Sequence, residues 1–263
     1  MLALIAGRGG LPTRIAQAQA QMPLICVLKG FEPDGLTADI TFRLEHLGTL
    51  LADLKSRGVL EVCLCGAIER PPVDPTALDA ATLPFVPIIM KALSAGDDGA
   101  LRAAIAVFED QGFEIRAAHD LVADLLIPEG VLSAVSPDDQ MIADAARANA
   151  VLAALAPLDV GQGCVVGAGQ IWGIETLGGT DHMLNTLPEG VAKARALLVK
   201  KPKEAQDRRV DMPTIGSGTI AAAVRAGLAG ICVEAGSVIL LEPEATLAAA
   251  DAAGLVLWAR DTP

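Results

Sequence analysis

Charged side chains gather in one segment of the sequence, residues 196–219, which is ALLVKKPKEAQDRRVDMPTIGSGT. Its lysines, arginines and aspartates are Lys200, Lys201, Lys203, Arg208, Arg209, Asp207 and Asp211. Basic side chains and the N–H groups of a glycine-led helix attract anions, and carboxylates beside phosphates bind hard cations such as Mg²⁺. The segment therefore predicts an anion site with a divalent cation at Asp211. The alternative is a solvated loop in which Asp211 only caps a turn.

A glycine turn follows the first predicted strand in AGRGGLP, residues 6–12. Gly7, Gly9 and Gly10 allow the backbone to approach a phosphate, and Pro12 suits the first turn of a helix whose N-terminus favours negative charge. A dinucleotide fingerprint needs glycine where Pro12 stands, so the G-x-G-x-x-G pattern is broken. Two interpretations stay open: a phosphate or nucleotide contact, and a bare strand-to-helix turn.

A third polar group occurs in ETLGGTDHML, residues 175–184, just after a predicted β-hairpin. Asp181 is a candidate second metal ligand, and the alternative is that it caps the N-terminus of the following helix. The sequence contains no G-x-S-x-G elbow, Walker A loop or H-E-x-x-H helix. It therefore lacks the usual marks of serine hydrolases, P-loop proteins and zincins.

The composition limits the possible partners. The chain has 263 residues, 52% of them hydrophobic, and a formal charge of -12. A negative field repels nucleic-acid backbones, and 3% aromatic residues without tyrosine leave few rings for base stacking. No uncharged run is long enough for a spanning helix, no export signal is visible, and the cysteines lie in apolar runs. We therefore predict a cytoplasmic protein that does not bind nucleic acid.

Strands and helices in alternation must hold these groups in place. In the first half, MLALIAG, LICVL, ITFRL and EVCLCGA predict short strands, and TLLADLKSRG predicts a helix between the last two. This alternation indicates a parallel sheet with crossover helices. The second half again mixes helices with strands and includes a hairpin around residues 167–169, so the whole chain is predicted to be α/β.

Periodicity is lost in DLLIPEGVLSAVSPDD, where Pro128, Gly130 and Pro137 interrupt the pattern. Domain boundaries commonly fall in segments of this kind, because few contacts cross them. We therefore predict an N-terminal domain over residues 1–128, a tether over residues 129–137, and a C-terminal α/β domain over residues 138–263.

Eight segments, taken in order, carry a family resemblance. They are AGRGGLP (6–12), GAIERP (66–71), GDDGALR (96–102), AHDLVADLLIPEGVL (118–132), LDVGQ (158–162), GTDHML (179–184), QDRRVDMPTIG (206–216) and GLAGICVEAG (227–236). Together they resemble the UDP-2,3-diacylglucosamine pyrophosphatases of lipid A biosynthesis that lack the calcineurin-like fold. The resemblance covers essentially the whole chain. It implies a Rossmann-like N-terminal domain with a parallel sheet, tethered to a second α/β domain.

The activity that the resemblance implies is hydrolysis of UDP-2,3-diacylglucosamine to UMP and 2,3-diacylglucosamine 1-phosphate. The family is magnesium-dependent, cytoplasmic and peripheral to the inner membrane, and the same is expected here. As partners we expect the lipid-linked substrate and its product, the inner membrane surface, and a second copy of the chain in a homodimer.

The resemblance also implies roles for single residues. The family's essential aspartate lies in a D-x-P-T-I-G segment that matches Asp211, so Asp211 is expected to position magnesium and to activate the attacking water. Many members have a lysine in a G-K-x-x-R-P segment where this chain has Ala67, whereas Arg70 is present. The expected substrate contacts are Gly7, Gly9, Gly10, Arg70, Thr180, Lys200, Thr214 and Gly216, and the expected metal ligands are Asp211 and Asp181.

Two other functions stay open from the residues alone. The first strand and its glycine turn also suit a nucleotide- or dinucleotide-binding oxidoreductase. A noncatalytic lipid-binding protein is favoured if Asp211 only caps a turn. Release of UMP that depends on a divalent ion separates the hydrolase from both.

Overall fold

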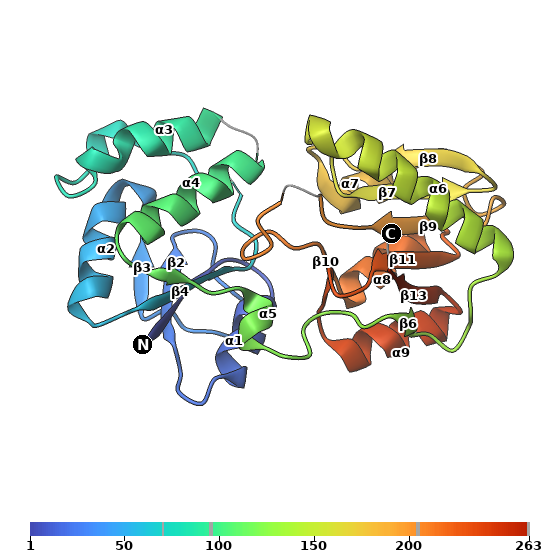
Figure 1. Ribbon diagram of the computed structural model, residues 1–263, viewed down its shortest axis with the longest axis horizontal. Helices are drawn as coiled ribbons and strands as arrows, with labels where there is room; N and C mark the ends of the chain where they lie inside the picture. Colours follow the sequence, from blue (N-terminus) through green and yellow to red (C-terminus); the bar gives the residue numbers. More distant parts are fainter. Residues whose placement is uncertain (70, 95–96, 204–205, 262–263) are drawn as a thin grey trace. The chain divides into compact units, whose positions relative to one another are not determined.

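A computed structural model describes residues 1–69, 71–94, 97–203 and 206–261, and the chain folds as two units (Figure 1). Unit 1 comprises Met1–Ala123 together with Asp207–Asp211. Unit 2 comprises Asp124–Gln206 together with the chain from Met212 onward. A short segment of the basic stretch, which includes Asp211, thus belongs to unit 1 although its sequence neighbours belong to unit 2.

Unit 1 is built on a five-stranded sheet in the order β3-β2-β1-β4-β5, and all its paired strands are parallel. The strands are β1 (Leu2–Ala6), β2 (Leu24–Leu28), β3 (Ile40–Phe42), β4 (Glu61–Cys65) and β5 (Glu114–Ile115). The helices are α1 (Leu11–Ala18), α2 (Leu47–Ser56), α3 (Val86–Ser94), α4 (Asp97–Asp110) and α5 (Ala118–Leu121), with 3-10 turns at Leu44–His46, Pro75–Ala77 and Leu83–Phe85. This arrangement confirms the predicted parallel sheet with crossover helices.

Alternation along the strands explains how this sheet is covered on both faces. Ala3 and Ile5 of β1 belong to one buried cluster that also contains Leu51 of α2 and Phe108 of α4. Residues of opposite parity point to the other face, since successive side chains of a strand alternate. Leu4 is fully buried there, and α1 contacts both β1 and α5. The carboxyl ends of β1 and β4 lie side by side at the centre of the sheet, where ligands of open α/β sheets usually bind.

Unit 2 contains a six-stranded sheet in the order β6-β13-β11-β9-β7-β8 and a separate parallel pair, β10 and β12. Strands β9, β11 and β13 are parallel, while β6, β7 and β8 add antiparallel edges. The strands are β6 (Gly130–Val131), β7 (Gly163–Gly167), β8 (Gln170–Ile174), β9 (Leu197–Lys200), β10 (Thr214–Ile215), β11 (Gly230–Glu234), β12 (Ile239–Leu240) and β13 (Val256–Arg260). The pairing of β7 with β8 confirms the predicted hairpin.

Helices cover both faces of the unit 2 sheet. They are α6 (Asp139–Leu155), α7 (Gly179–Asn185), α8 (Ser217–Arg225) and α9 (Pro243–Ala253), with a 3-10 turn at Ala156–Leu158. Leu197 and Val199 of β9 pack with Met141 of α6, whereas Leu198 between them packs with Ile220 of α8. By this alternation, Lys200 at the end of β9 shares the face of Leu198, toward α7 and α8.

The passage between the units lies between Ala123 and Asp124. Residues 129–137, predicted as a tether, lie within unit 2. Gly130–Val131 pairs with β13, and the Leu257 N–H donates to the Ser133 hydroxyl over 2.8 Å. The glycine of this segment therefore lies in an edge strand that is hydrogen-bonded to the sheet. Gly130 pairs with β13 although its φ is +132, as glycine can at a sheet edge.

One helix of unit 2 resembles a membrane span by length and composition. Among the described residues, Asp139–Leu158 is the stretch long and apolar enough for this. It contains Asp144 and Arg147, and Ala148 and Leu152 on one of its faces are buried against the sheet. The contacts of that face are those of a core helix of unit 2.

Candidate functional site

The glycine turn of unit 1 is joined to the end of β4. The Gly7 N–H donates to the Cys65 carbonyl over 2.8 Å, and Arg8 and Ala67 exchange two backbone hydrogen bonds of 2.9 and 3.0 Å. A Cβ atom at Gly7 would lie 2.6 Å from the Ala67 carbonyl oxygen, and one at Gly66 would lie 2.6 Å from the Gly7 carbonyl oxygen. Gly7 and Gly66 are therefore small because two loops touch, and the Gly7 N–H is already used within the chain.

Gly9 and Gly10 lie in different surroundings from Gly7. Among the described residues, apart from the chain neighbours, no atom lies within 4 Å of a Cβ built on either residue. Gly9 has φ +91, which favours glycine, whereas Gly10 has φ -82, which any residue adopts. Within the described part of the chain, neither N–H donates a hydrogen bond. These two N–H groups at the start of α1 are the ones that a phosphate can reach.

Arg8, between these glycines, is held by contacts within the chain. Its guanidinium donates to the Gly30 carbonyl over 2.8 Å and lies 4.9 Å from the centre of the Phe31 ring. It also lies 3.5 Å from the Glu69 carboxylate. Arg8 thereby ties the loops after β1, β2 and β4 together at the carboxyl edge of the sheet. The next residue after Glu69, Arg70, lies outside the described residues.

Asp211 lies at the end of the short segment that returns to unit 1. Val210 packs against the buried cluster of unit 1, and the Asp211 N–H donates to the Asp207 carbonyl over 3.0 Å. The Asp207 carboxylate accepts from Arg209 Nε, Nη2 and N over 3.0, 2.7 and 3.1 Å. These bonds to Arg209 lower the pKa of Asp207. Asp207 thus closes the turn, and Asp211 at the end of the turn is half-buried.

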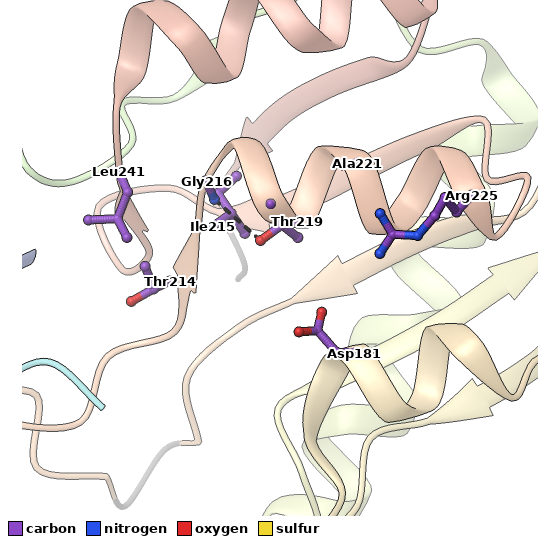
Figure 2. A pocket seen from close by; sticks show the side chains of 9 residues that line it. Asp181, Thr214, Ile215, Gly216, Thr219, Ala221, Arg225 and Leu241 are labelled. Atoms are coloured by element: carbon purple, nitrogen blue, oxygen red, sulfur yellow. Dashed lines mark hydrogen bonds between the residues drawn. The ribbon is translucent and has the colours of Figure 1, made fainter. Parts of the chain in front are cut away.

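Unit 2 has a pocket of about 440 Å³ beside the N-terminus of α8 (Figure 2). It is lined by Asp181, Thr214, Ile215, Gly216, Gly218, Thr219, Ala221, Arg225 and Leu241. Two expected substrate contacts, Thr214 and Gly216, and one expected metal ligand, Asp181, therefore meet in one place. The N–H groups of the first turn of a helix have no partner within the helix, so this wall favours negative charge.

Asp181 projects from the first turn of α7 toward the α8 wall of this pocket (Figure 2). The N-cap of α7 is Gly178, and no side chain caps the helix. The interpretation of Asp181 as a helix cap is therefore wrong. Its carboxylate and the Arg225 guanidinium border the same hollow from two helices, and among the described residues no ion pair joins them. The pocket thus offers both a cationic and an anionic group to a ligand.

Lys200 lies beside the first turn of α7 and is only 6% exposed. Its Nζ donates to the Thr180 hydroxyl over 2.8 Å, and that hydroxyl donates to Glu175 Oε2 over 2.6 Å. The Lys200 Nζ itself lies 3.9 Å from Glu175 Oε2. Burial lowers the pKa of Lys200, and the negative charges of Glu175 and Asp181 oppose that shift. Lys200 and Thr180 are therefore close to the pocket but bonded to each other.

The other cations of the basic segment do not form one cluster. Lys201 is buried and lies 3.8 Å from Glu234, and Arg209 in unit 1 binds Glu109 over 2.6 Å. Lys203 pairs with Asp159. The sequence indicated a shared positive patch, whereas the structure pairs each of these three cations with a different carboxylate, and Arg209 with Asp207 as well.

A metal ion has no preformed protein cage in the part of the chain that the structure describes. No group of three or more histidine, cysteine, aspartate or glutamate side chains is gathered there in a geometry that could hold one. Mg²⁺ is commonly held by one or two carboxylates while substrate phosphates and water supply the remaining oxygens. The described residues fit magnesium in this second form, with the substrate as part of the site.

Six residues that line the pocket were not among the expected site residues: Ile215, Gly218, Thr219, Ala221, Arg225 and Leu241. Thr219 accepts from the Gly216 N–H over 3.3 Å, and Arg225 follows on the same helix. Thr219 and Arg225 could have been predicted from the sequence, since a helix that begins at a candidate site places further residues along that site. Leu241 had no comparable signal, because only the pairing of β12 with β10 brings it there.

The fold and these groups define a class, a two-unit α/β protein with a glycine turn at the sheet centre of unit 1 and a polar pocket in unit 2. Residues 1–125 match the model of the LpxI N-terminal domain, and residues 128–258 match that of the LpxI C-terminal domain. The chain therefore belongs to the LpxI family, which confirms the resemblance found in the sequence.

A curated relative extends this match to nearly the whole chain. UDP-2,3-diacylglucosamine pyrophosphatase LpxI of Caulobacter vibrioides is 38% identical over 275 residues, which cover 99% of this chain and 97% of that protein. The passage from unit 1 to unit 2 after Ala123 falls close to the point where one family domain ends and the other begins. Each unit thus corresponds closely to one LpxI domain.

Proposed function

We propose that this chain hydrolyses the pyrophosphate bond of UDP-2,3-diacylglucosamine to give UMP and 2,3-diacylglucosamine 1-phosphate. The observation that carries the proposal is the 38% identity to a UDP-2,3-diacylglucosamine pyrophosphatase over 99% of the chain. The identity extends over both domains of the family.

The chemistry of the substrate explains what the chain's own residues must do. A diphosphate is strongly anionic, and this protein has a formal charge of -12, so local groups must offset the repulsion. Two separate places are suited to hold phosphate oxygens: the N–H groups of Gly9 and Gly10 in unit 1, and, in unit 2, the pocket that contains the first turn of α8 and Arg225 at the end of that helix. We assign these groups to binding and orienting the diphosphate, and Asp211 to the cation and the attacking water.

Magnesium is part of this proposal. Asp211 is the first carboxylate that we assign to it, and Asp181 is the second candidate. A bound Mg²⁺ supplies charge neutralisation of the diphosphate and a more acidic water. Because the described residues form no cage of their own, the ion and the substrate are expected to bind together.

We further propose a cytoplasmic enzyme at the inner membrane surface. The substrate carries two acyl chains and a UDP group, so its apolar end stays in the lipid while its nucleotide faces water. Membrane contact is then transient and follows the substrate. The homodimer stays a prediction.

The experiment is a UMP-release assay on the purified full chain, with UDP-2,3-diacylglucosamine in detergent micelles and a magnesium titration after chelation. We expect release that is lost on chelation and restored by Mg²⁺. UDP-N-acetylglucosamine, which lacks the acyl chains, is the matched control and should be a poor substrate. Tight binding without UMP release would favour a lipid-binding protein, and nucleotide-dependent redox turnover would favour an oxidoreductase.

A further inference from the structure

A buried hydrogen-bond chain links the end of β9 to the first turn of α7. Lys200 Nζ donates to Thr180 Oγ1 over 2.8 Å, and Thr180 Oγ1 donates to Glu175 Oε2 over 2.6 Å. Thr180 is thus the central member, because its one hydroxyl both accepts and donates. Lys200 is 6% exposed and Glu175 is 7% exposed, so removal of either charge alone leaves the other buried without its partner.

The backbone around Glu175 leaves space for this carboxylate. A Cβ atom at Gly163 would lie 2.5 Å from Glu175 Oε2, and the Glu175 N–H donates to the Gly163 carbonyl over 2.8 Å. Gly161 approaches the same residue, since a Cβ atom there would lie 2.1 Å from the Glu175 carbonyl oxygen. The start of β7, the end of β8 and the end of β9 are therefore built around one buried acid.

This hydrogen-bond chain joins the first turn of helix α7 to the sheet. Its N-cap, Gly178, has no side chain to accept a backbone N–H, and Gly179 follows with φ +75. Two glycines leave the entry to the helix flexible. The Thr180 hydroxyl is the side-chain link from the first turn to buried groups of the sheet. Asp181, the next residue, lines the α8 pocket.

We propose that Lys200 is a positioning residue, which acts through Thr180 to hold Asp181 at the wall of the α8 pocket. Direct substrate binding by Lys200 is the alternative that the sequence suggested, but its ammonium is buried and bonded to Thr180. The proposal identifies Glu175 as a further member of the site. Its catalytic consequence rests on the proposed function, whereas its structural part does not.

The test separates the hydroxyl from the methyl group of Thr180. Thr180→Val keeps the shape but removes both hydrogen bonds, and Thr180→Ser keeps both bonds. We expect Thr180→Val to lower kcat/KM for UMP release about tenfold, as is typical when a supporting hydrogen bond is lost. Thr180→Ser should recover most of that loss. Thr186→Val at the C-cap of the same helix is the matched control, because among the described residues the Thr186 hydroxyl bonds to the His182 and Met183 carbonyls at the other end of α7.

Double variants test whether the effect passes through Asp181. Thr180→Val added to Asp181→Asn should cause little further loss, and both single variants should divide their loss between kcat and KM in the same way. Because Lys200→Met alone strands a buried carboxylate, Lys200→Met is combined with Glu175→Gln, and this pair should resemble Thr180→Val. Two results would overturn the proposal in favour of direct contact by Lys200. One is a loss in the double variant that equals the product of the Thr180→Val and Asp181→Asn losses, and the other is a normal kcat/KM in Asp181→Asn.

Hydrogen exchange of the ligand-free protein gives a readout that does not depend on activity. Thr180→Val should speed exchange of the amides in residues 179–185, while Thr180→Ser and Thr186→Val should leave the first turn protected. Unchanged exchange in Thr180→Val would overturn the positioning role even if the enzyme is active. Faster exchange in a protein that releases no UMP would instead remove the proposed function and leave the structural link in place.

Discussion

The two glycine turns of the molecule share a sequence pattern but differ in what surrounds them. In unit 1, β1 leads through Gly7–Gly10 into α1, and the turn is fastened to the loop after β4 by backbone contacts. In unit 2, β10 leads through Gly216 into α8, whose first turn contains Gly218, and this turn borders a pocket of about 440 Å³. The comparison shows that the sequence pattern of strand, glycine and helix does not distinguish glycines required by contacts within the protein from glycines that leave room for a ligand.

The largest effect on activity is expected from Asp211, in the segment Asp207–Asp211 of unit 1, and not from the pocket of unit 2. Asp211→Ala should lower kcat about a thousandfold or more, because a carboxylate that acts mainly in the transition state contributes little to substrate binding. Substrate should therefore still bind, and mass spectrometry of the purified variant should detect it. Asp207→Ala is the control within the same segment: it breaks the bonds to Arg209 and should lower the thermal midpoint more than kcat. Near-normal turnover in Asp211→Ala across a magnesium titration would move the chemistry away from this segment.

A second prediction concerns Gly66 of unit 1, where a close approach of two loops requires glycine. Gly66→Ala should destabilise the protein by about 2–4 kcal/mol, because it combines a left-handed backbone with a clash against other backbone atoms. Gly66 has φ +85, and a Cβ atom there would lie 2.6 Å from the Gly7 carbonyl oxygen. Gly112→Ala is the matched control, since Gly112 has φ +88 but, in the part of the chain that the structure describes, no atom beyond its chain neighbours within 4 Å of the Cβ position. It should cost only the strain, about 1–2 kcal/mol. Equal midpoints in chemical denaturation would show that the two loops move apart easily.

A third, smaller effect is expected in the unit 2 pocket. Asp181→Asn keeps the size of the side chain and removes its charge, and it should lower kcat/KM about tenfold, a change typical of a supporting ligand. Its apparent affinity for Mg²⁺ in the presence of substrate should fall as well. The comparison with Asp211→Asn decides which carboxylate is the main one. A loss of kcat/KM in Asp181→Asn as large as that in Asp211→Asn would show that the two carboxylates contribute equally to the reaction.

The fold was largely predictable because its signals are local. Short apolar runs, glycine stops and a helical pattern in TLLADLKSRG indicated the parallel sheet of unit 1, and the hairpin of unit 2 followed from two strands around Gly167 and Gly169. The packing of residues 207–211 with unit 1 was not predictable. It depends on one apolar side chain, Val210, within a charged stretch, and on an ion pair between Arg209 and Glu109 that are far apart in sequence.

The candidate site was predictable only in its residue types. Asp181, Thr214 and Gly216 were expected at a site, and they line one pocket. Lys200 followed from its charge, but its burial could not be seen, because the partner of its hydrogen bond lies in α7 and the acid behind it follows β8. Sequence spacing shows which face of a strand a residue occupies. It does not show what covers that face.

The smallest effects test the comparison of the two turns most directly. Gly10 and Gly218 both lie at helix starts, outside the left-handed region, and no atom of the described residues beyond their own surroundings in the chain lies within 4 Å of a Cβ position. The fold therefore accepts alanine at either place, and each substitution should change the free energy of unfolding by no more than about 1 kcal/mol. Any larger change in substrate affinity then reports a ligand close to that backbone.

We expect Gly10→Ala to raise KM about tenfold, equivalent to roughly 1.4 kcal/mol of lost binding, and Gly218→Ala to raise it much less. In unit 1 the N–H groups of Gly9 and Gly10 stand without an acceptor among the described residues, so a phosphate must come against the backbone itself, where a methyl group obstructs it. In unit 2 the pocket is large enough for a methyl group and offers Thr219 and Arg225 as alternative contacts. Steady-state kinetics with UDP-2,3-diacylglucosamine, paired with chemical denaturation of each variant, measures both quantities. A rise in KM for Gly218→Ala and none for Gly10→Ala would assign the phosphate to unit 2 and make the turn of unit 1 a purely structural one.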